Sequence, residues 1–115
     1  MKFSIRALLE HDAGRVAKMA AALSAHEGTP PPPFGADDVI RYGFGNQKRF
    51  DGFVAEQDSE LVGYTIFINS FDIGKDTPGA HMLDLYVEQR VRGTGAGRAL
   101  IGAVAAETIA RGGSW

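Results

Sequence analysis

A strand-like run, a glycine-rich turn and a helix-like run follow one another near the end of the chain. Residues 81–87 read H-M-L-D-L-Y-V, and residues 90–100 read R-V-R-G-T-G-A-G-R-A-L, with three glycines at alternate positions. Glycine has no Cβ and adopts positive φ freely, so backbone N–H groups in such a turn can approach a ligand closely. This order predicts a strand–turn–helix unit within an α/β or α+β fold with a mostly antiparallel sheet.

Hydrophobic periodicity predicts the elements that precede this unit. Apolar alternation over residues 3–7 indicates a first strand, and residues 16–23 carry an apolar stripe typical of a helix. We expect Asp12 to cap that helix and Gly28 to end it, before T-P-P-P-P-F-G forms an extended arm. A short helix should then open at Asp37 or Asp38 and close at Gly43 or Gly45.

The middle of the chain reads as a sheet. F-V-A-E at residues 53–56 and the apolar run from Leu61 predict a hairpin, followed by a loop over residues 70–79. In the next strand, alternation places Leu83, Leu85 and Val87 on one face, and Met82, Asp84 and Tyr86 on the other. The last helix should run from Ala96 towards Arg111, with an apolar side formed by Leu100, Ile101, Val104, Ala105 and Thr108. Within it Gly102 costs about 1 kcal/mol relative to alanine, which predicts a close approach by another backbone or a ligand.

Length and composition limit the possible functions. The 115 residues predict a single domain over residues 1–115, and 44% hydrophobic with 23% charged residues is typical of a globular protein. A net charge of −2 gives no general attraction to nucleic acid or acidic membranes, which normally require a basic face, and so argues against them as partners. The chain has no cysteine and no long apolar run, and His11 and His81 lack metal-ligand spacing. We therefore expect a cytoplasmic protein without a metal.

The glycine turn differs from two common phosphate-binding patterns. The dinucleotide pattern G-x-G-x-x-G fails because Arg98 or Leu100 stands at its last position, and a P-loop would need a lysine after the glycines. The pattern that remains is R-x-x-G-x-G, from Arg92 to Gly97. A helix N-terminus offers free N–H donors and partial positive charge, and Arg90, Arg92 and Arg98 add further charge. A pyrophosphate site is therefore favoured over a purely structural turn.

The segment L-D-L-Y-V-E-Q-R-V-R-G-T-G-A-G-R-A-L-I resembles the acetyl-CoA-binding motif of the GNAT superfamily of N-acetyltransferases. The family pattern Q/R-x-x-G-x-G/A falls on Arg92, Gly95 and Gly97. Within the superfamily the sequence is most similar to the diamine (spermidine/spermine) acetyltransferases, through L-S-A-H-E, Y-G-F-G, F-V-A-E and M-L-D-L-Y-V. The family fold usually continues beyond R-G-G-S-W, which resembles the start of a further strand, so a C-terminally truncated fold is expected.

This resemblance implies a co-substrate and a reaction. Acetyl-CoA would place its pantetheine amides along the backbone of Leu85, Tyr86 and Val87. Direct attack of an amine on the thioester is implied, with a backbone N–H near Val87 stabilising the oxyanion. The pyrophosphate would be held by Arg92 and by the backbone N–H groups of the turn: Gly93, Thr94, Gly95, Ala96, Gly97 and Arg98.

The resemblance also implies residues for the amine. His26 and Glu27 match a substrate-contacting position, and Asp84 matches an acid on the strand beside the thioester, which makes it a candidate to bind an ammonium or help to remove its proton. The family's neighbouring acid corresponds to Leu83, which argues against a preference for a long polyamine. A solvated helix end for His26 and Glu27, or an outward-facing strand position for Asp84, is the alternative. No residue is assigned as general acid.

Three functions remain open from the sequence. The first is N-acetyl transfer from acetyl-CoA to a small-molecule amine, and the others are a non-catalytic acetyl-CoA-binding module and a structural dimerisation domain. Without a following strand, residues 81–87 would form a long apolar sheet edge, which favours pairing with another chain. We therefore expect a homodimer.

Overall fold

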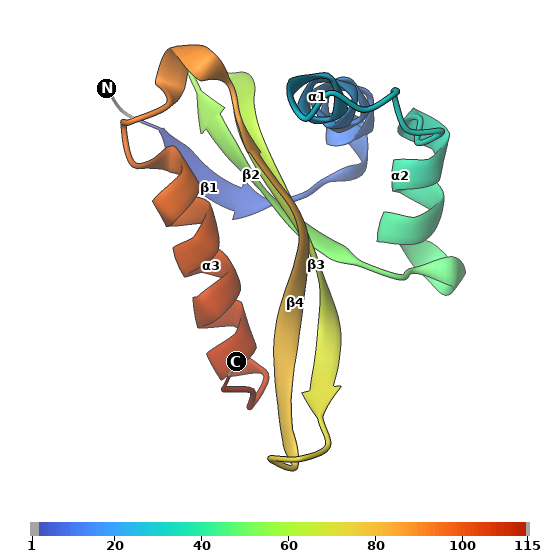
Figure 1. Cartoon of the computed structure of the whole chain (residues 1–115), viewed down its shortest axis with the longest axis vertical. Helices are drawn as coiled ribbons and strands as arrows, with labels where there is room; N and C mark the ends of the chain where they lie inside the picture. Colours follow the sequence, from blue (N-terminus) through green and yellow to red (C-terminus); the bar gives the residue numbers. More distant parts are fainter. Residues whose placement is uncertain (1–2, 115) are drawn as a thin grey trace.

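A computed structural model describes residues 3–114. These residues form one antiparallel sheet with helices on both faces (Figure 1). The sheet order is β1-β2-β3-β4, so each strand pairs with the next one along the chain. The strands are β1 (Ser4–Ala7), β2 (Asp51–Gln57), β3 (Glu60–Asp72) and β4 (Thr77–Val87), and the helices are α1 (Ala13–His26), α2 (Ala36–Gly43) and α3 (Ala96–Ala110).

This architecture confirms the predicted α+β class and the order of the elements. Helices α1 and α2 lie on one face of the sheet and α3 on the other, while the β3–β4 hairpin extends beyond them (Figure 1). Gly28 follows α1 with a φ of 75°, as expected for a residue that ends a helix. Residues 29–35 form neither helix nor strand.

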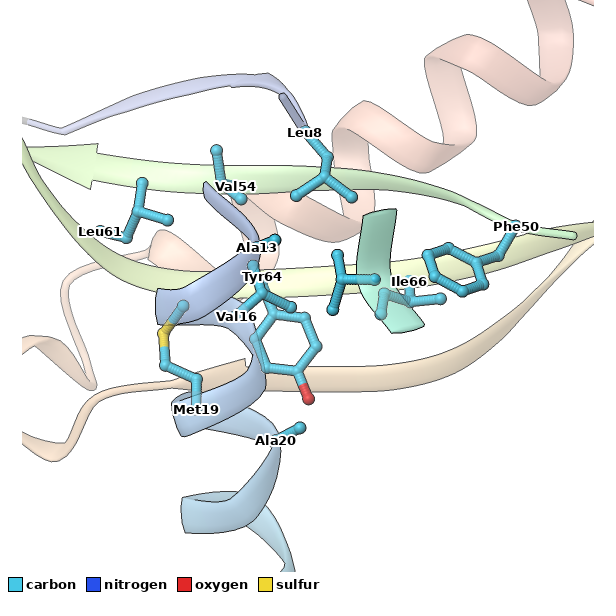
Figure 2. Close-up of a cluster of buried hydrophobic side chains, with 11 residues drawn as sticks. Leu8, Ala13, Val16, Met19, Ala20, Phe50, Val54, Leu61, Tyr64 and Ile66 are labelled. Carbon is cyan, nitrogen blue, oxygen red and sulfur yellow. The ribbon is translucent and has the colours of Figure 1, made fainter. Parts of the chain in front are cut away.

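The core has two parts, one on each face of the sheet. Under α1 and α2 the apolar stripe of α1 packs on β2 and β3, and Figure 2 shows Tyr64 within this cluster with its hydroxyl directed towards β4. Val16 and Met19 are buried there, as the periodicity predicted. Under α3 a smaller cluster contains Ala55, Val62, Val91 and Leu100. Burial of these side chains is the main favourable term in folding, at roughly 25 cal/mol per Å² of apolar area.

The structure corrects the expected loop over residues 70–79. Strand β3 continues to Asp72 and β4 begins at Thr77, so only a short turn separates them. Asp72, Gly74 and Asp76 are residue types typical of loops, which is why a loop was expected. In the structure the long hairpin pairs Phe71 with Pro78 and Asp72 with Thr77. Antiparallel pairing with a neighbouring strand outweighs the weak strand propensity of these residues.

Two local expectations were also wrong. Asp12 precedes α1, but its carboxylate makes no hydrogen bond to the helix. It instead accepts from the guanidinium of Arg6 at 2.8 and 2.9 Å and from the backbone N–H of Leu9 at 2.8 Å. Gly102 is exposed, and a Cβ built on it would meet nothing within 4 Å, so no other part of the described chain approaches it closely.

A β-bulge in β4 corrects the predicted faces of that strand. Ile66 pairs with Asp84 and Phe67 with Met82, which leaves Leu83 as an extra residue. Alternation is broken there, so Leu83 lies on the α1 face together with Asp84, and Met82 lies on the α3 face. Leu85 and Val87 share a face, as predicted, and that face packs on the α3 side.

The C-terminal residues contact the start of β4. After α3, Gly112 adopts a φ of 85°, and the backbone N–H of Ser114 donates to the carbonyl of Pro78 at 3.0 Å. Residues 111–114 form no strand in the structure, and this is their one backbone hydrogen bond with the edge of β4. Trp115, which belongs to the start of the strand expected at R-G-G-S-W, lies outside the described residues. No helix within residues 3–114 has the length and apolar character that crossing a membrane requires.

Candidate functional site

The glycine turn connects the end of β4 to the N-terminus of α3. A short 3-10 turn, Gln89–Val91, comes first, and Val91 is buried in the smaller core cluster, which anchors the turn. Gly93 and Gly95 then adopt φ values of 84° and 96°. These are left-handed conformations that favour glycine, so the glycines direct the chain from the strand into the helix.

A hollow of about 590 Å³ lies over this turn. Cβ atoms built on Gly93 and Gly95 would meet nothing within 4 Å, so the absent side chains leave open space there. The first intrahelical bond of α3 runs from the N–H of Ala99 to the carbonyl of Gly95 at 2.9 Å, which leaves the N–H groups of the first turn, Ala96, Gly97 and Arg98, free to bind an anion. The N–H of Thr94, which was also expected to bind it, instead donates to the carbonyl of Val91 at 3.3 Å. The lining residues are Val87, Val91, Arg92, Gly93, Thr94, Gly95, Gly97 and Arg98.

The arginines of this segment have different surroundings. Arg98 is exposed and lines the hollow. Arg92 also lines it, but its Nε donates to the carbonyl of Val87 at 2.9 Å, and its guanidinium lies 5.8 Å from the centre of the Tyr86 ring. Arg90 points elsewhere, because it forms ion pairs with Glu88 at 3.1 Å and Glu60 at 3.2 Å. Arg92 and Arg98 are therefore the two arginines available to a phosphate.

The other residues expected to bind the co-substrate flank this hollow. Leu85 and Val87 pack their side chains on the α3 side, and Tyr86 faces the other side, 6.3 Å from Tyr64 between ring centres. Ala96 is buried, so it can offer its backbone N–H but not its side chain. Within residues 3–114 no strand pairs with the outer edge of β4, which leaves backbone groups near Val87 for a ligand.

A second hollow, of about 370 Å³, lies on the opposite face of β4. Helix α1, the proline-rich arm and strands β3 and β4 surround it, and most of its wall is apolar. Asp84 and Glu27 are its only ionisable lining residues among those described. The full lining is Ala20, Leu23, Ser24, Glu27, Pro32, Phe34, Phe50, Ile66, Leu83 and Asp84.

A hydrogen bond fixes the carboxylate of Asp84 in this second hollow. The hydroxyl of Tyr64 donates to Oδ2 of Asp84 at 2.8 Å, and the backbone carbonyl of Asp84 accepts from the Thr65 hydroxyl at 2.8 Å. Burial raises the pKa of Tyr64 well above 10, and the hydrogen bond to Asp84 and the negative charges of Asp84 and Glu27 raise it further. Tyr64 is therefore a neutral donor that orients Asp84.

The predicted amine-side residues are only partly brought together. Glu27 and Asp84 line the same hollow, whereas His26 is exposed at the end of α1 and does not line it. No role was predicted for Tyr64, because its contact with Asp84 depends on the strand register, which alternation alone does not reveal. Among residues 3–114, no group of His, Asp and Glu side chains is arranged to hold a metal ion.

Comparison with protein families gives a match over most of the chain. A model described as the acetyltransferase (GNAT) family matches residues 19–114. This segment includes both hollows and the whole glycine turn. A search of curated proteins found no match.

Solved structures share the fold. A ribosomal-protein-alanine N-acetyltransferase from Brucella melitensis biovar Abortus 2308 is 24% identical with a TM-score of 0.79, covering 99% of this chain and 76% of that one. An aminoglycoside acetyltransferase from an uncultured soil metagenomic sample, in complex with sisomicin, is 21% identical with a TM-score of 0.76 over 97% of this chain and 73% of that one. An integron cassette protein from the mobile metagenome of Cole Harbour Salt Marsh is 18% identical with a TM-score of 0.83 over 96% and 72%.

Proposed function

The chain belongs to the acetyltransferase (GNAT) family, and we propose that it transfers the acetyl group of acetyl-CoA to a primary amine of a small molecule. The observation that carries this proposal is the open hollow at the N-terminus of α3, where glycines remove side chains from the path of a pyrophosphate. Free N–H groups of the first turn, with Arg92 and Arg98, supply the donors and the positive charge that such a group requires.

The arrangement supports direct transfer. The neutral amine nitrogen attacks the acetyl carbonyl carbon, the C–S bond breaks, the sulfur leaves as a thiolate and takes up a proton, and the amine loses one. Asp84 lies on β4 three residues before Val87, near which the family resemblance implies the thioester. Its carboxylate is a candidate to hold the incoming ammonium and to accept a proton, directly or through water.

The narrower expectations from the sequence stay predictions. Glu27 and Asp84 share one hollow, as the resemblance to the diamine acetyltransferases implies, but Leu83 lines it where those enzymes have a second acid, which argues against a polyamine as the substrate. A cytoplasmic location and a homodimer are likewise part of the proposal.

Two measurements test the proposed function. Acetyl-CoA at 100 times its dissociation constant should stabilise the chain by about 2.7 kcal/mol in a thermal melt. Pantetheine, which lacks the pyrophosphate, should give a smaller shift at the same concentration. Thiol release on addition of primary amines then reports transfer. Stabilisation without thiol release from any amine would indicate a non-catalytic acetyl-CoA-binding module. No stabilisation would contradict the proposal and leave the turn with a structural role.

A further inference from the structure

We propose that the acceptor is a primary amine carrying a single apolar group, such as an arylalkylamine or a short alkylamine, rather than a polyamine or an amino sugar. This inference rests on the proposed function and names its substrate class. The site is the 370 Å³ hollow between α1, the proline-rich arm and β4, which we call the acceptor hollow.

Charge in the acceptor hollow selects an ammonium group. Neither Asp84 nor Glu27 forms an ion pair with any cationic side chain among residues 3–114, although six other carboxylates do so. Asp84 is half-buried and Glu27 is exposed at the end of α1. Tyr64 donates to only one oxygen of Asp84, so the carboxylate retains acceptor capacity for N–H donors of a ligand. A cationic ligand therefore supplies the partner that the protein does not.

The apolar wall limits what can be attached to that ammonium. Phe34, Phe50 and Leu83 line the hollow together with aliphatic residues of α1 and β3. The hydroxyls of an amino sugar would be desolvated against these side chains without hydrogen-bond partners, at a cost of roughly 2–7 kcal/mol for each buried polar group. A second ammonium could pair with Glu27, but that carboxylate is exposed at the end of α1, where an ion pair contributes only about 0–1 kcal/mol and does not offset burial against the apolar wall. An aromatic ring or alkyl chain gains free energy from the same surface.

The volume and the bulge support the same substrate class. A hollow of about 370 Å³ is at the small end of the range of roughly 300–1,000 Å³ typical of small-molecule sites. The bulge in β4 brings Leu83 into this hollow beside Asp84, so the wall next to the ammonium position is apolar. With regular alternation Leu83 would face α3 and could not contribute to specificity.

The test is a binding experiment that does not require acetyl transfer. Calorimetry with the 115-residue chain compares 2-phenylethylamine with 1,4-diaminobutane, and with 2-phenylethanol, which has the same ring but no ammonium. Each titration is made alone and in the presence of CoA, which cannot donate an acetyl group. We expect 2-phenylethylamine to bind about tenfold or more tightly than either other compound. Equal or tighter binding of 1,4-diaminobutane, or no binding of 2-phenylethylamine in either condition, would overturn the proposal.

Two variants test separately the apolar wall and the carboxylate of the acceptor hollow as determinants of amine binding. Leu83→Glu changes a side chain that is 50% exposed, so the fold should tolerate it. It should weaken 2-phenylethylamine and strengthen 1,4-diaminobutane, reversing their order. Asp84→Asn should weaken both amines and leave 2-phenylethanol unchanged. If both variants fold by circular dichroism but keep the wild-type order and affinities, the amines bind elsewhere. Because acetyl-CoA binding and thiol release are measured separately, a failure here differs from a failure of the proposed function.

Discussion

Gly95 links the local backbone to the proposed site. Its φ of 96° is strained for any residue with a Cβ, and a Cβ placed there would project into open space rather than into the core. Gly102 lies inside α3, the helix that follows Gly95, and it is exposed with a helical conformation. A Cβ placed on Gly102 would also meet nothing within 4 Å. Substitutions at the two glycines therefore report different effects. Gly95 reports the need for a left-handed residue and an open hollow, and Gly102 reports only the cost of glycine inside a helix.

We expect Gly95→Ala to lower the free energy of unfolding by about 1–2 kcal/mol through left-handed strain and to abolish the stabilisation by acetyl-CoA. Gly102→Ala should raise the free energy of unfolding by about 1 kcal/mol and leave that stabilisation unchanged. Thermal melts with and without acetyl-CoA measure both effects. If Gly95→Ala binds acetyl-CoA like the wild type, the glycine serves only the turn.

At the scale of elements, long periodic segments were predictable and irregular ones were not. Helices α1 and α3 begin and end close to the expected residues because their apolar spacing and flanking glycines agree. The bulge at Leu83 was not predictable, since an extra residue in one strand leaves no mark in the alternation. The hydrogen bond between Tyr64 and Asp84 depends on that register, so the role of Tyr64 could not be predicted from the sequence. The glycine turn consists of consecutive residues, so it could be predicted.

Asp12 determines how β1 leads into α1. Its carboxylate is 3% exposed and bonds to Arg6, on β1, and to the N–H of Leu9. Burial raises the pKa of Asp12, but the hydrogen bonds from Arg6 and Leu9 outweigh it, so the pKa lies below its ordinary value of 3.8. Because the folded pKa is lowered, this contribution to stability is present above about pH 4 and is lost as the pH falls through the lowered pKa.

We expect Asp12→Asn to lower the free energy of unfolding by about 1.5–3 kcal/mol at pH 7, because Arg6 loses a charged acceptor. Urea unfolding followed by circular dichroism measures this, and the difference from wild type should shrink near pH 3. Glu10→Gln, an exposed carboxylate in the same turn, should change stability by less than about 0.5 kcal/mol and serves as the control. Equal effects of the two substitutions would show that the Arg6 contact contributes little.

For the whole molecule, the outer edge of β4 is a long strand edge that no other strand of the described chain covers. Beyond the bond from Ser114 to Pro78, no backbone bond to this edge is present among residues 3–114. A groove of about 250 Å³ lies between this strand and α3, and Ile101 and Ile109 line it while being 47% and 71% exposed. An unpaired strand next to exposed apolar side chains favours association with a second strand.

A homodimer in which a second copy covers this groove is therefore the prediction at this scale. Size-exclusion chromatography with light scattering should give twice the chain mass of 12.3 kDa, and Ile101→Glu should shift the protein to monomer because a charge would be buried in the interface. Ile73, which is 88% exposed in the turn between β3 and β4, provides the control, and Ile73→Glu should leave the dimer intact. A wild-type chain that stays monomeric at high micromolar concentration would contradict the prediction. Dissociation by both variants would place the contact at the hairpin rather than at the groove.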